Sequence, residues 1–318
     1  MRKLCLSALL LPALTALAEQ DVINKSFTAN AGGTLSMNVD RGSIKIVTAK
    51  GDKVEIEVVR ELKRASAEKA REAFDQHKID FAQDGDTIRI EADNNGGFKS
   101  LFNNMQVEYT VTVPAKFNVE LRTAGGNIAV DDLDGQAKVQ TSGGNLDFGV
   151  ITGEIDARTS GGNIKIKGGG KNVKVQTTGG SVAIGNVDGD LAVKSSGGNL
   201  TLEHIKGAIE AQTTGGSIKI ASAGGPIKAA SSGGNVSAEL TDQASGECTL
   251  KTTGGSIKVA VPEKIAVDLN ASTSGGEVTS DFDGEFNKQR TKLVAKINGG
   301  GPQMKLSTSG GNVDIRKR

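Results

Sequence analysis

The sequence predicts an all-β fold, a parallel β-solenoid of 18-residue coils preceded by an N-terminal capping region that contains one helix. Three observations predict it. A Gly-Gly doublet recurs at a fixed interval, apolar and polar residues alternate around each doublet, and the chain has 43 glycines but only 5 prolines, one tyrosine and no tryptophan. A fixed period is typical of repeat architectures, and the scarcity of aromatic residues indicates a core of small aliphatic side chains.

The first residues have the pattern of a secretory signal. Two basic residues, Arg2 and Lys3, precede an apolar stretch over 4–17, and a small-x-small cleavage pattern ends it. We therefore expect a signal peptide over 1–18 and an exported protein that is periplasmic, at the cell surface or extracellular. The apolar stretch is shorter than the roughly 20 residues of a membrane-spanning helix, and no later segment is comparable, so we expect no membrane span.

Residues 19–122 lack the period, and we expect them to form an N-terminal cap. Alternating stretches such as 54–59 and 105–113 predict strands. The segment 62–78 is rich in Ala, Glu, Lys and Arg with apolar residues along one side, which predicts an amphipathic helix. The segment 94–104 (NNGGFKSLFNN) predicts a loop or a hairpin tip. An uncovered terminal coil would expose a sheet edge, so the cap should cover the first coil.

Residues 123–280 contain the predicted solenoid repeats. The first glycine of each doublet (position 0) lies at Gly125, Gly143, Gly161, Gly179, Gly197, Gly215 and Gly233, always 18 residues apart, and then at Gly254, Gly275 and Gly310. Positions −6 and +3 are apolar in every unit. Each unit therefore predicts two short strands joined at a Gly-Gly corner, with residues one period apart in contact, as with Val175, Val193 and Ala211.

The corner residues carry two further expectations. We expect the doublet glycines to supply positive φ at a tight corner, and the Asn common at position +2 to form hydrogen bonds along the stack. At position −2, a Thr or Ser has the parity of the core, so its hydroxyl should point inward and satisfy corner backbone groups. The column at −1 is also rich in Ser and Thr, which keeps an outward Thr array open as an alternative.

Residues 281–318 predict an irregular insertion or a strand pair, followed by a closing coil. The segment 281–298 breaks the period and contains Phe282, Phe286 and mixed charges. The final unit resumes the pattern and ends in Arg316-Lys317-Arg318.

The residues offer no catalytic, cofactor-binding or metal-ligating set, and we assign none. Calcium-binding repeats need Asp after the glycines, whereas position +4 is repeatedly Lys. The acidic cluster Asp131, Asp132 and Asp134 is interpreted as a solvated turn. The only histidines, His77 and His204, have no second His nearby in sequence, so a His/Cys metal site is not expected.

The remaining composition excludes two further features. Cys248 is the only cysteine after cleavage, so no disulfide forms within the chain, and its core parity predicts a buried, inert thiol. The formal net charge of +1 gives no electrostatic case for a nucleic-acid partner.

Several segments together resemble a known family. They are GGTLSMNVDRGSIKI at 32–46, DGDTIRIEA at 84–92, VEYTVTVPAKFNVEL at 107–121, the TSGGNI ladder, and NGGGPQMKLSTSGGNVDI at 298–315. They resemble the bacterial putative-adhesin family of unknown function, over nearly the whole mature chain. The resemblance implies a right-handed parallel β-solenoid in a cell-envelope protein, and it implies no catalytic residues.

A rod without convergent reactive groups predicts a protein that is not an enzyme: an exported adhesin-like or cell-envelope scaffold that presents a rigid repeat surface to an unknown envelope or surface component. Two alternatives stay open. A glycan-active enzyme on a β-helix would show a deep cleft with two or more carboxylates. An ice- or surface-binding solenoid would show a flat outward array of Thr.

Overall fold

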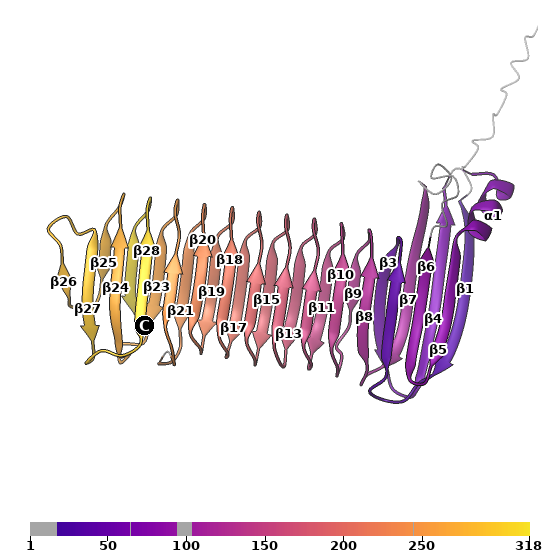
Figure 1. Cartoon of the computed structure of the whole chain (residues 1–318), viewed down its shortest axis with the longest axis horizontal. Helices are drawn as coiled ribbons and strands as arrows, with labels where there is room; N and C mark the ends of the chain where they lie inside the picture. Colours follow the sequence, from indigo (N-terminus) through magenta and orange to yellow (C-terminus); the bar gives the residue numbers. More distant parts are fainter. Residues whose placement is uncertain (1–17, 64, 94–103, 244) are drawn as a thin grey trace, which may run out of the picture.

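The structure is a computed structural model that describes residues 18–63, 65–93, 104–243 and 245–318. It is a long rod of two β-sheets packed face to face, with the strands running across the long axis (Figure 1). Within the described residues the two sheets have 14 and 15 strands. The predicted signal peptide, apart from Ala18, and nearly all of the predicted 94–104 loop lie outside the described residues.

Each repeat contributes one strand to each sheet, and the Gly-Gly corner joins the two. The regular repeats give the first sheet the strands β9 (Ile128–Val130), β11 (Leu146–Ile151), β13 (Ile164–Gly169), β15 (Val182–Val187), β17 (Leu200–Ile205), β19 (Ile218–Ala223), β21 (Val236–Leu240) and β23 (Ile257–Val261). They give the second sheet the strands β8 (Asn118–Thr123), β10 (Ala137–Thr141), β12 (Ile155–Arg158), β14 (Val173–Gln176), β16 (Leu191–Lys194), β18 (Ile209–Thr213), β20 (Ile227–Ser231) and β22 (Cys248–Lys251).

The stacking register confirms the predicted solenoid. Val175 of β14 pairs with Val193 of β16, which pairs with Ala211 of β18, all in parallel and all at most 1% exposed. Residues one period apart are therefore neighbours in a common interior. Alternating side chains from both sheets fill that interior, and burying them supplies the hydrophobic free energy that one coil alone lacks.

The expectation that the doublet glycines supply positive φ is wrong, because none of them has positive φ. The second glycine of the doublet is required instead by the approach of the stacked coils. A Cβ on Gly180 would collide with the carbonyl oxygen of Gly162 in the preceding coil, whereas a Cβ on Gly179 would meet Gly161 at an ordinary 3.5 Å. The corner therefore needs glycine for close backbone contact rather than for a left-handed conformation.

Two ladders of side chains fix the corners, as the sequence predicts. At position −2, Thr177 donates its hydroxyl to the carbonyl of Gly162 (2.9 Å) and accepts the N–H of Gly180 (3.2 Å). At position +2, the Asn163 side chain accepts the backbone N–H of Ser181 in the next coil at 2.8 Å. The −2 residues are at most 8% exposed, so the expected inward orientation of their hydroxyls is confirmed.

At the N-terminal end the chain does not stack in sequence order. The strands here are β1 (Glu19–Thr28), β2 (Thr34–Val39), β3 (Ser43–Ala49), β4 (Lys53–Leu62), β5 (Lys78–Asp84), β6 (Thr87–Asp93) and β7 (Met105–Pro114). The strands β2 and β3 form a coil that lies between β8/β9 on one side and β6/β7 on the other. Antiparallel strands β4 and β1 extend the first sheet, and β5 closes the second.

The C-terminal end repeats this arrangement. The strands are β24 (Val267–Thr273), β25 (Val278–Ser280), β26 (Glu285–Phe286), β27 (Lys292–Ile297), β28 (Gln303–Thr308) and β29 (Val313–Lys317). The last coil, β28/β29, is inserted between β22/β23 and β24/β25. The strands β26 and β27 form an antiparallel hairpin that covers the outer side of β24. The last strand of the chain, β29, therefore lies between two other strands of its sheet.

The helix α1 (Ala67–Gln76) confirms the single helix expected in the cap. It is shorter than the predicted segment, because β4 continues to Leu62 and the Ser66 side chain caps the helix N-terminus. Ala70 and Ala73 are buried against the end of the core. In the described ranges no helix has the length and apolar character needed to cross a membrane.

Candidate functional site

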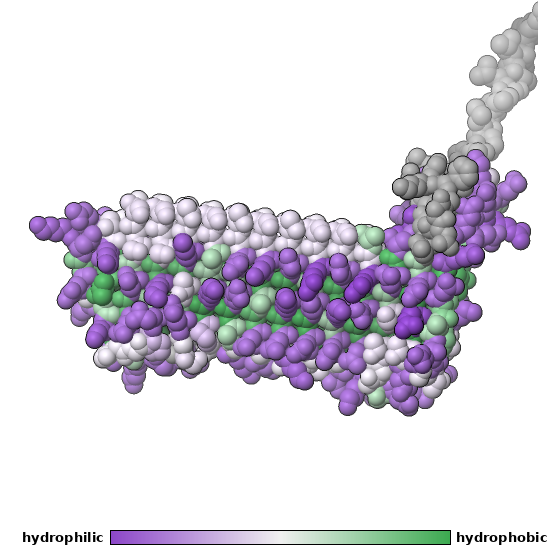
Figure 2. Space-filling view, viewed as in Figure 1, coloured by the Kyte–Doolittle hydropathy of each residue, from purple (hydrophilic) through white to green (hydrophobic). Residues whose placement is uncertain are grey.

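An uncharged ridge runs along one long edge of the rod. At all ten Gly-Gly corners, the first glycine and the residue before it are exposed. The residues at this −1 position are Ala124, Ser142, Ser160, Thr178, Ser196, Thr214, Ser232, Thr253, Ser309 and Ser274, in their order along the stack. Figure 2 shows the edge as an unbroken pale band above a face studded with hydrophilic side chains. We call these ten pairs the ridge.

Backbone hydrogen bonds hold the ridge from coil to coil. At six successive corners, from Gly161 to Gly254, the N–H of the first glycine donates to the carbonyl of the −1 residue of the preceding coil, for example Gly179 to Ser160 and Gly197 to Thr178, both at 2.9 Å. The −2 hydroxyls brace the same corners from inside. The ridge is therefore a row of small side chains on a fixed backbone, which loses little conformational entropy on binding a ligand.

A shallow groove lies beside the ridge on the second sheet. Its floor is the column at position −3, which in stack order reads Asn38, Arg122, Gln140, Arg158, Gln176, Lys194, Gln212, Ala230 and Lys251. Two stretches of the groove have volumes of about 550 and 540 Å³, and a smaller depression lined by Gln140 and Arg158 adjoins the first of them. Ridge residues form one wall. Basic residues alternate with Gln over the first six repeat strands. The column holds no acidic residue from Asn38 to Lys251, whereas β6 places Glu91 next to Asn38 at its N-terminal end.

The basic side chains of the groove are positioned by acidic residues one column further from the ridge. Arg158 pairs with Asp156 at 2.8 Å, and Lys194 lies 3.8 Å from Glu210. Arg122 lies 3.3 Å from Glu120, which also pairs with Lys138 at 2.9 Å. These pairs are exposed and contribute little to stability, but they orient the cationic groups beside the groove floor.

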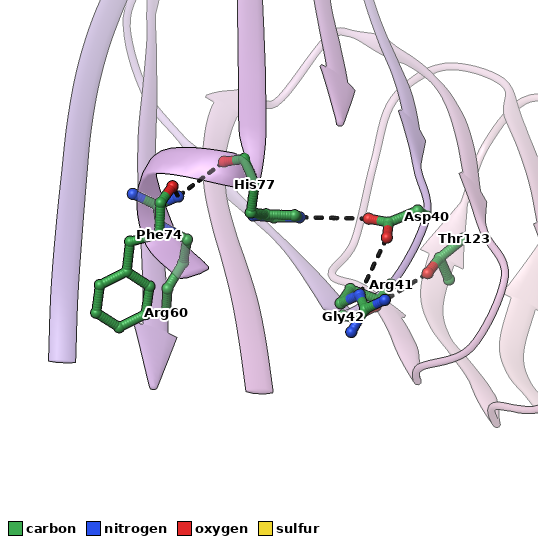
Figure 3. Close-up of polar contacts among 7 residues, drawn as sticks. All are labelled: Asp40, Arg41, Gly42, Arg60, Phe74, His77 and Thr123. Atoms are coloured by element: carbon green, nitrogen blue, oxygen red, sulfur yellow. Dashed lines mark hydrogen bonds and ion pairs between the residues drawn. The ribbon is translucent and has the colours of Figure 1, made fainter. Parts of the chain in front are cut away.

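Asp40 closes the N-terminal end of the groove. It takes the place of a ridge residue in the β2/β3 coil, and its carboxylate contacts the Arg41 guanidinium (3.0 Å) and Nε2 of His77 (3.3 Å), as Figure 3 shows. His77 is 1% exposed and follows α1, so the contact ties the cap to the first coil. Burial alone would raise the pKa of Asp40, but hydrogen bonds from His77 and Arg41 outweigh it and hold the pKa below its usual value.

A second set of contacts holds His77 in place. The Arg60 guanidinium donates to the backbone carbonyls of His77 (2.8 Å) and Phe74 (2.7 Å), three residues that Figure 3 draws. Arg60 also pairs with Asp21. Burial raises the pKa of the nearby Tyr109 phenol well above its ordinary range. In this polar cluster Arg60 and His77 are buried, whereas Asp21, Asp40 and Arg41 are partly exposed, so its role is structural support for the end of the groove.

The other residues singled out from the sequence have structural roles. Asp132 accepts the N–H of Val150 (2.7 Å) and Asp134 accepts the Thr152 hydroxyl (2.6 Å), so both cap the stacked turn of the next coil. His204 is exposed on β17, and Cys248 is buried, which raises the pKa of its thiol. Across the described ranges, no group of three or more His, Cys, Asp or Glu side chains is arranged to hold a metal ion.

Neither the groove column nor the contact between Asp40 and His77 was predicted from the sequence. The column carried a signal, because aligning the repeats on their doublets displays Arg, Gln, Arg, Gln, Lys and Gln at position −3. The contact between Asp40 and His77 has no comparable signal in the sequence, since the two residues lie 37 positions apart in a part of the chain without a period.

Stacked parallel coils, Gly-Gly corners and inserted end coils define a two-sheet β-solenoid repeat protein. The chain matches the family described as Toastrack DUF4097 over residues 33–316, and it belongs to that family. No curated protein matches the chain.

The chain also has low similarity to several solved structures. A putative cell adhesion protein from Clostridium sporogenes is 11% identical, with a TM-score of 0.30, and the match covers 94% of this chain and 100% of that one. A putative adhesin from Bacteroides fragilis is 12% identical, with a TM-score of 0.36 and coverage of 94% and 97%. A putative lipid binding protein from Parabacteroides distasonis is also 12% identical, with a TM-score of 0.40 and the same coverage. These values are too low to carry an argument about function.

Proposed function

We propose that this protein is a non-catalytic, exported, adhesin-like scaffold of the cell envelope that presents its ridge and groove to an envelope or surface component. The observation that carries the proposal is the ridge, where the −1 residue and the first glycine are exposed at ten successive corners. Such a row offers the same polar contact at every coil. Stacking makes it rigid, so it suits recognition of an extended partner rather than the enclosure of a small substrate.

The glycan-active alternative has weaker support. Two carboxylates, Asp40 and Glu91, line the N-terminal stretch of the groove. A glycosidase needs one carboxylic acid whose pKa is raised so that it can donate a proton. The pKa of Asp40 is lowered, and its carboxylate is occupied by Arg41 and His77. A glycan-active enzyme is therefore supported less well than a non-catalytic scaffold.

The ice-binding alternative is disfavoured by the chemistry of the ridge. Its exposed column is one residue wide and mostly Ser, with Thr at only three of ten corners. The complete Thr-rich column is the buried one at position −2. Ice binding requires a flat, outward array of Thr, whereas this protein exposes a narrow row of mostly Ser side chains at its corners.

The test is binding of the purified protein to isolated cell envelopes of its source organism, after fractionation has established where the protein resides. A variant carrying Ser160→Gln, Ser196→Gln and Ser232→Gln places a larger neutral side chain on every second corner, which should lower envelope binding at least several-fold. The matched control carries Ala183→Gln, Thr201→Gln and Ser237→Gln on the outer face of the first sheet. Equal binding by both variants, or a purely cytoplasmic location, would refute the proposal.

A further inference from the structure

The groove beside the ridge has a regular charge pattern that the proposed function does not use. On successive strands of the second sheet, Arg122, Arg158 and Lys194 occupy every second place, and Gln140, Gln176 and Gln212 occupy the places between. Strands in a sheet are roughly 4.8 Å apart, so the cationic groups recur at about 9.6 Å. The pattern is a linear array of hydrogen-bonding amides and hydroxyls with one positive charge for every two coils.

We infer that the groove binds an extended acidic polysaccharide that has one carboxylate on about every second sugar. The inference rests on the proposed function and names the class of its ligand. An extended disaccharide is about as long as two coils are thick, so one acid group would meet each basic residue in turn. Arg presents a planar fork that matches a carboxylate, and Gln and Ser/Thr side chains can both donate to and accept from sugar hydroxyls.

The acidic partners of the basic residues are consistent with this ligand. Asp156 and Glu210 lie one column further from the ridge than Arg158 and Lys194, and every one of these side chains is at least partly exposed. The Lys194–Glu210 pair is exposed and long, so it is weak, whereas Arg158 holds Asp156 through Nε (3.0 Å) and Nη2 (2.8 Å). A ligand carboxylate in the groove can therefore take Lys194 from Glu210 at little cost and share the guanidinium of Arg158 with Asp156.

Nucleic acid fits the groove less well. Duplex DNA carries one negative charge per about 1.7 Å, several times the linear density of positive charge in the groove. Proteins that bind single strands stack bases on aromatic side chains, and the groove column contains none, while Tyr109 is buried. The low charge density and the hydroxyl-rich wall favour a sparsely charged glycan.

The experiment measures binding of the full mature chain to hyaluronan, which has a carboxylate on every second sugar, with dextran as the neutral polymer and oligo(dT) as the nucleic acid. The variant Arg158→Gln/Lys194→Gln makes the column neutral between Arg122 and Lys251, with a residue that the column already contains. The control Lys165→Gln/Lys219→Gln removes two exposed charges from the other sheet. We expect the groove variant to lose roughly tenfold in affinity for hyaluronan, the control less than twofold, and dextran to bind weakly to all three proteins.

The outcomes separate this inference from the proposed function. Wild-type protein that binds cell envelopes but not hyaluronan, or binds oligo(dT) more tightly, overturns the ligand class and leaves the scaffold proposal standing. Equal losses in the two double variants overturn the assignment to the groove. Failure to bind envelopes overturns the proposed function itself, whatever the polymers do.

Discussion

At the scale of single residues, the two glycines of each doublet have different requirements. The second glycine is packed on the backbone of the preceding coil, and the first lies on the exposed ridge. This asymmetry arises because consecutive coils approach most closely at the inner side of the corner. Sequence alone cannot distinguish the two, since both are invariant across the ten repeats.

Substitution of the two glycines should therefore have unequal effects. Gly180→Ala forces a Cβ against the Gly162 carbonyl and should lower the free energy of unfolding by about 1–3 kcal/mol or prevent folding. Gly179→Ala, whose Cβ has ordinary contacts, should change it by less than about 1 kcal/mol. Urea unfolding of both variants is the measurement. Equal destabilisation would show that backbone conformation, not close approach, requires the doublet.

The −2 hydroxyls give a second comparison. Thr177→Val keeps the shape of a buried side chain but leaves the Gly162 carbonyl and the Gly180 N–H without their partner. We expect a loss of about 1–3 kcal/mol in the free energy of unfolding. Thr178→Val, one residue further and exposed, should stay within about 0.5 kcal/mol. A near-neutral Thr177→Val would mean that water satisfies the corner.

The contact of Asp40 with His77 and Arg41 predicts a dependence on pH. Because the folded-state pKa of Asp40 is lowered, its carboxylate stabilises the fold above the unfolded-state pKa of roughly 3.9, and this stabilisation is lost as the pH falls through the folded-state value. Asp40→Asn should therefore be less stable than wild type at pH 7 by about 1.5–3 kcal/mol, the range for hydrogen bonds to charged groups. The difference should shrink in acid. Thermal unfolding from pH 2 to 7 tests this, and a difference that is constant with pH would contradict it.

At the scale of strands, each end of the rod has one coil that lies between two others out of sequence order. The final strand β29 lies between β23 and β25, and Arg318 still donates its backbone N–H to Val261 at 3.0 Å. Each end is then covered by antiparallel strands or by a short edge strand, which limits pairing with other molecules.

Hydrogen exchange should reveal the inserted coil. Amides of β29, the last strand in the chain, should exchange more slowly than those of β25, which is the edge of its sheet. In a solenoid that stacks in sequence order, the opposite ranking holds, because the last coil frays first. Mass spectrometry on peptic fragments that cover 278–280 and 313–317 separates the two cases.

At the scale of the whole molecule, the sequence determined the middle of the rod better than its ends. The period places Val175, Val193 and Ala211 in contact because each pairing repeats the one before. The pairing of Leu35 with Val119 spans 84 residues and follows no period, so only the tertiary structure shows it. The same holds for the contact of Asp40 with His77. The groove could be predicted in part. The repeats specify the residues of its column, but its depth depends on the ridge beside it, which only the structure shows.

Every corner in the middle of the rod uses the same set of bonds to the coil before it, so one coil can follow any other. Adding or removing an 18-residue unit would change the length of the rod by roughly 4.8 Å while leaving both ends intact. The length of the rod can thus evolve by duplication of a single unit, and each added unit would add one contact point for a linear partner.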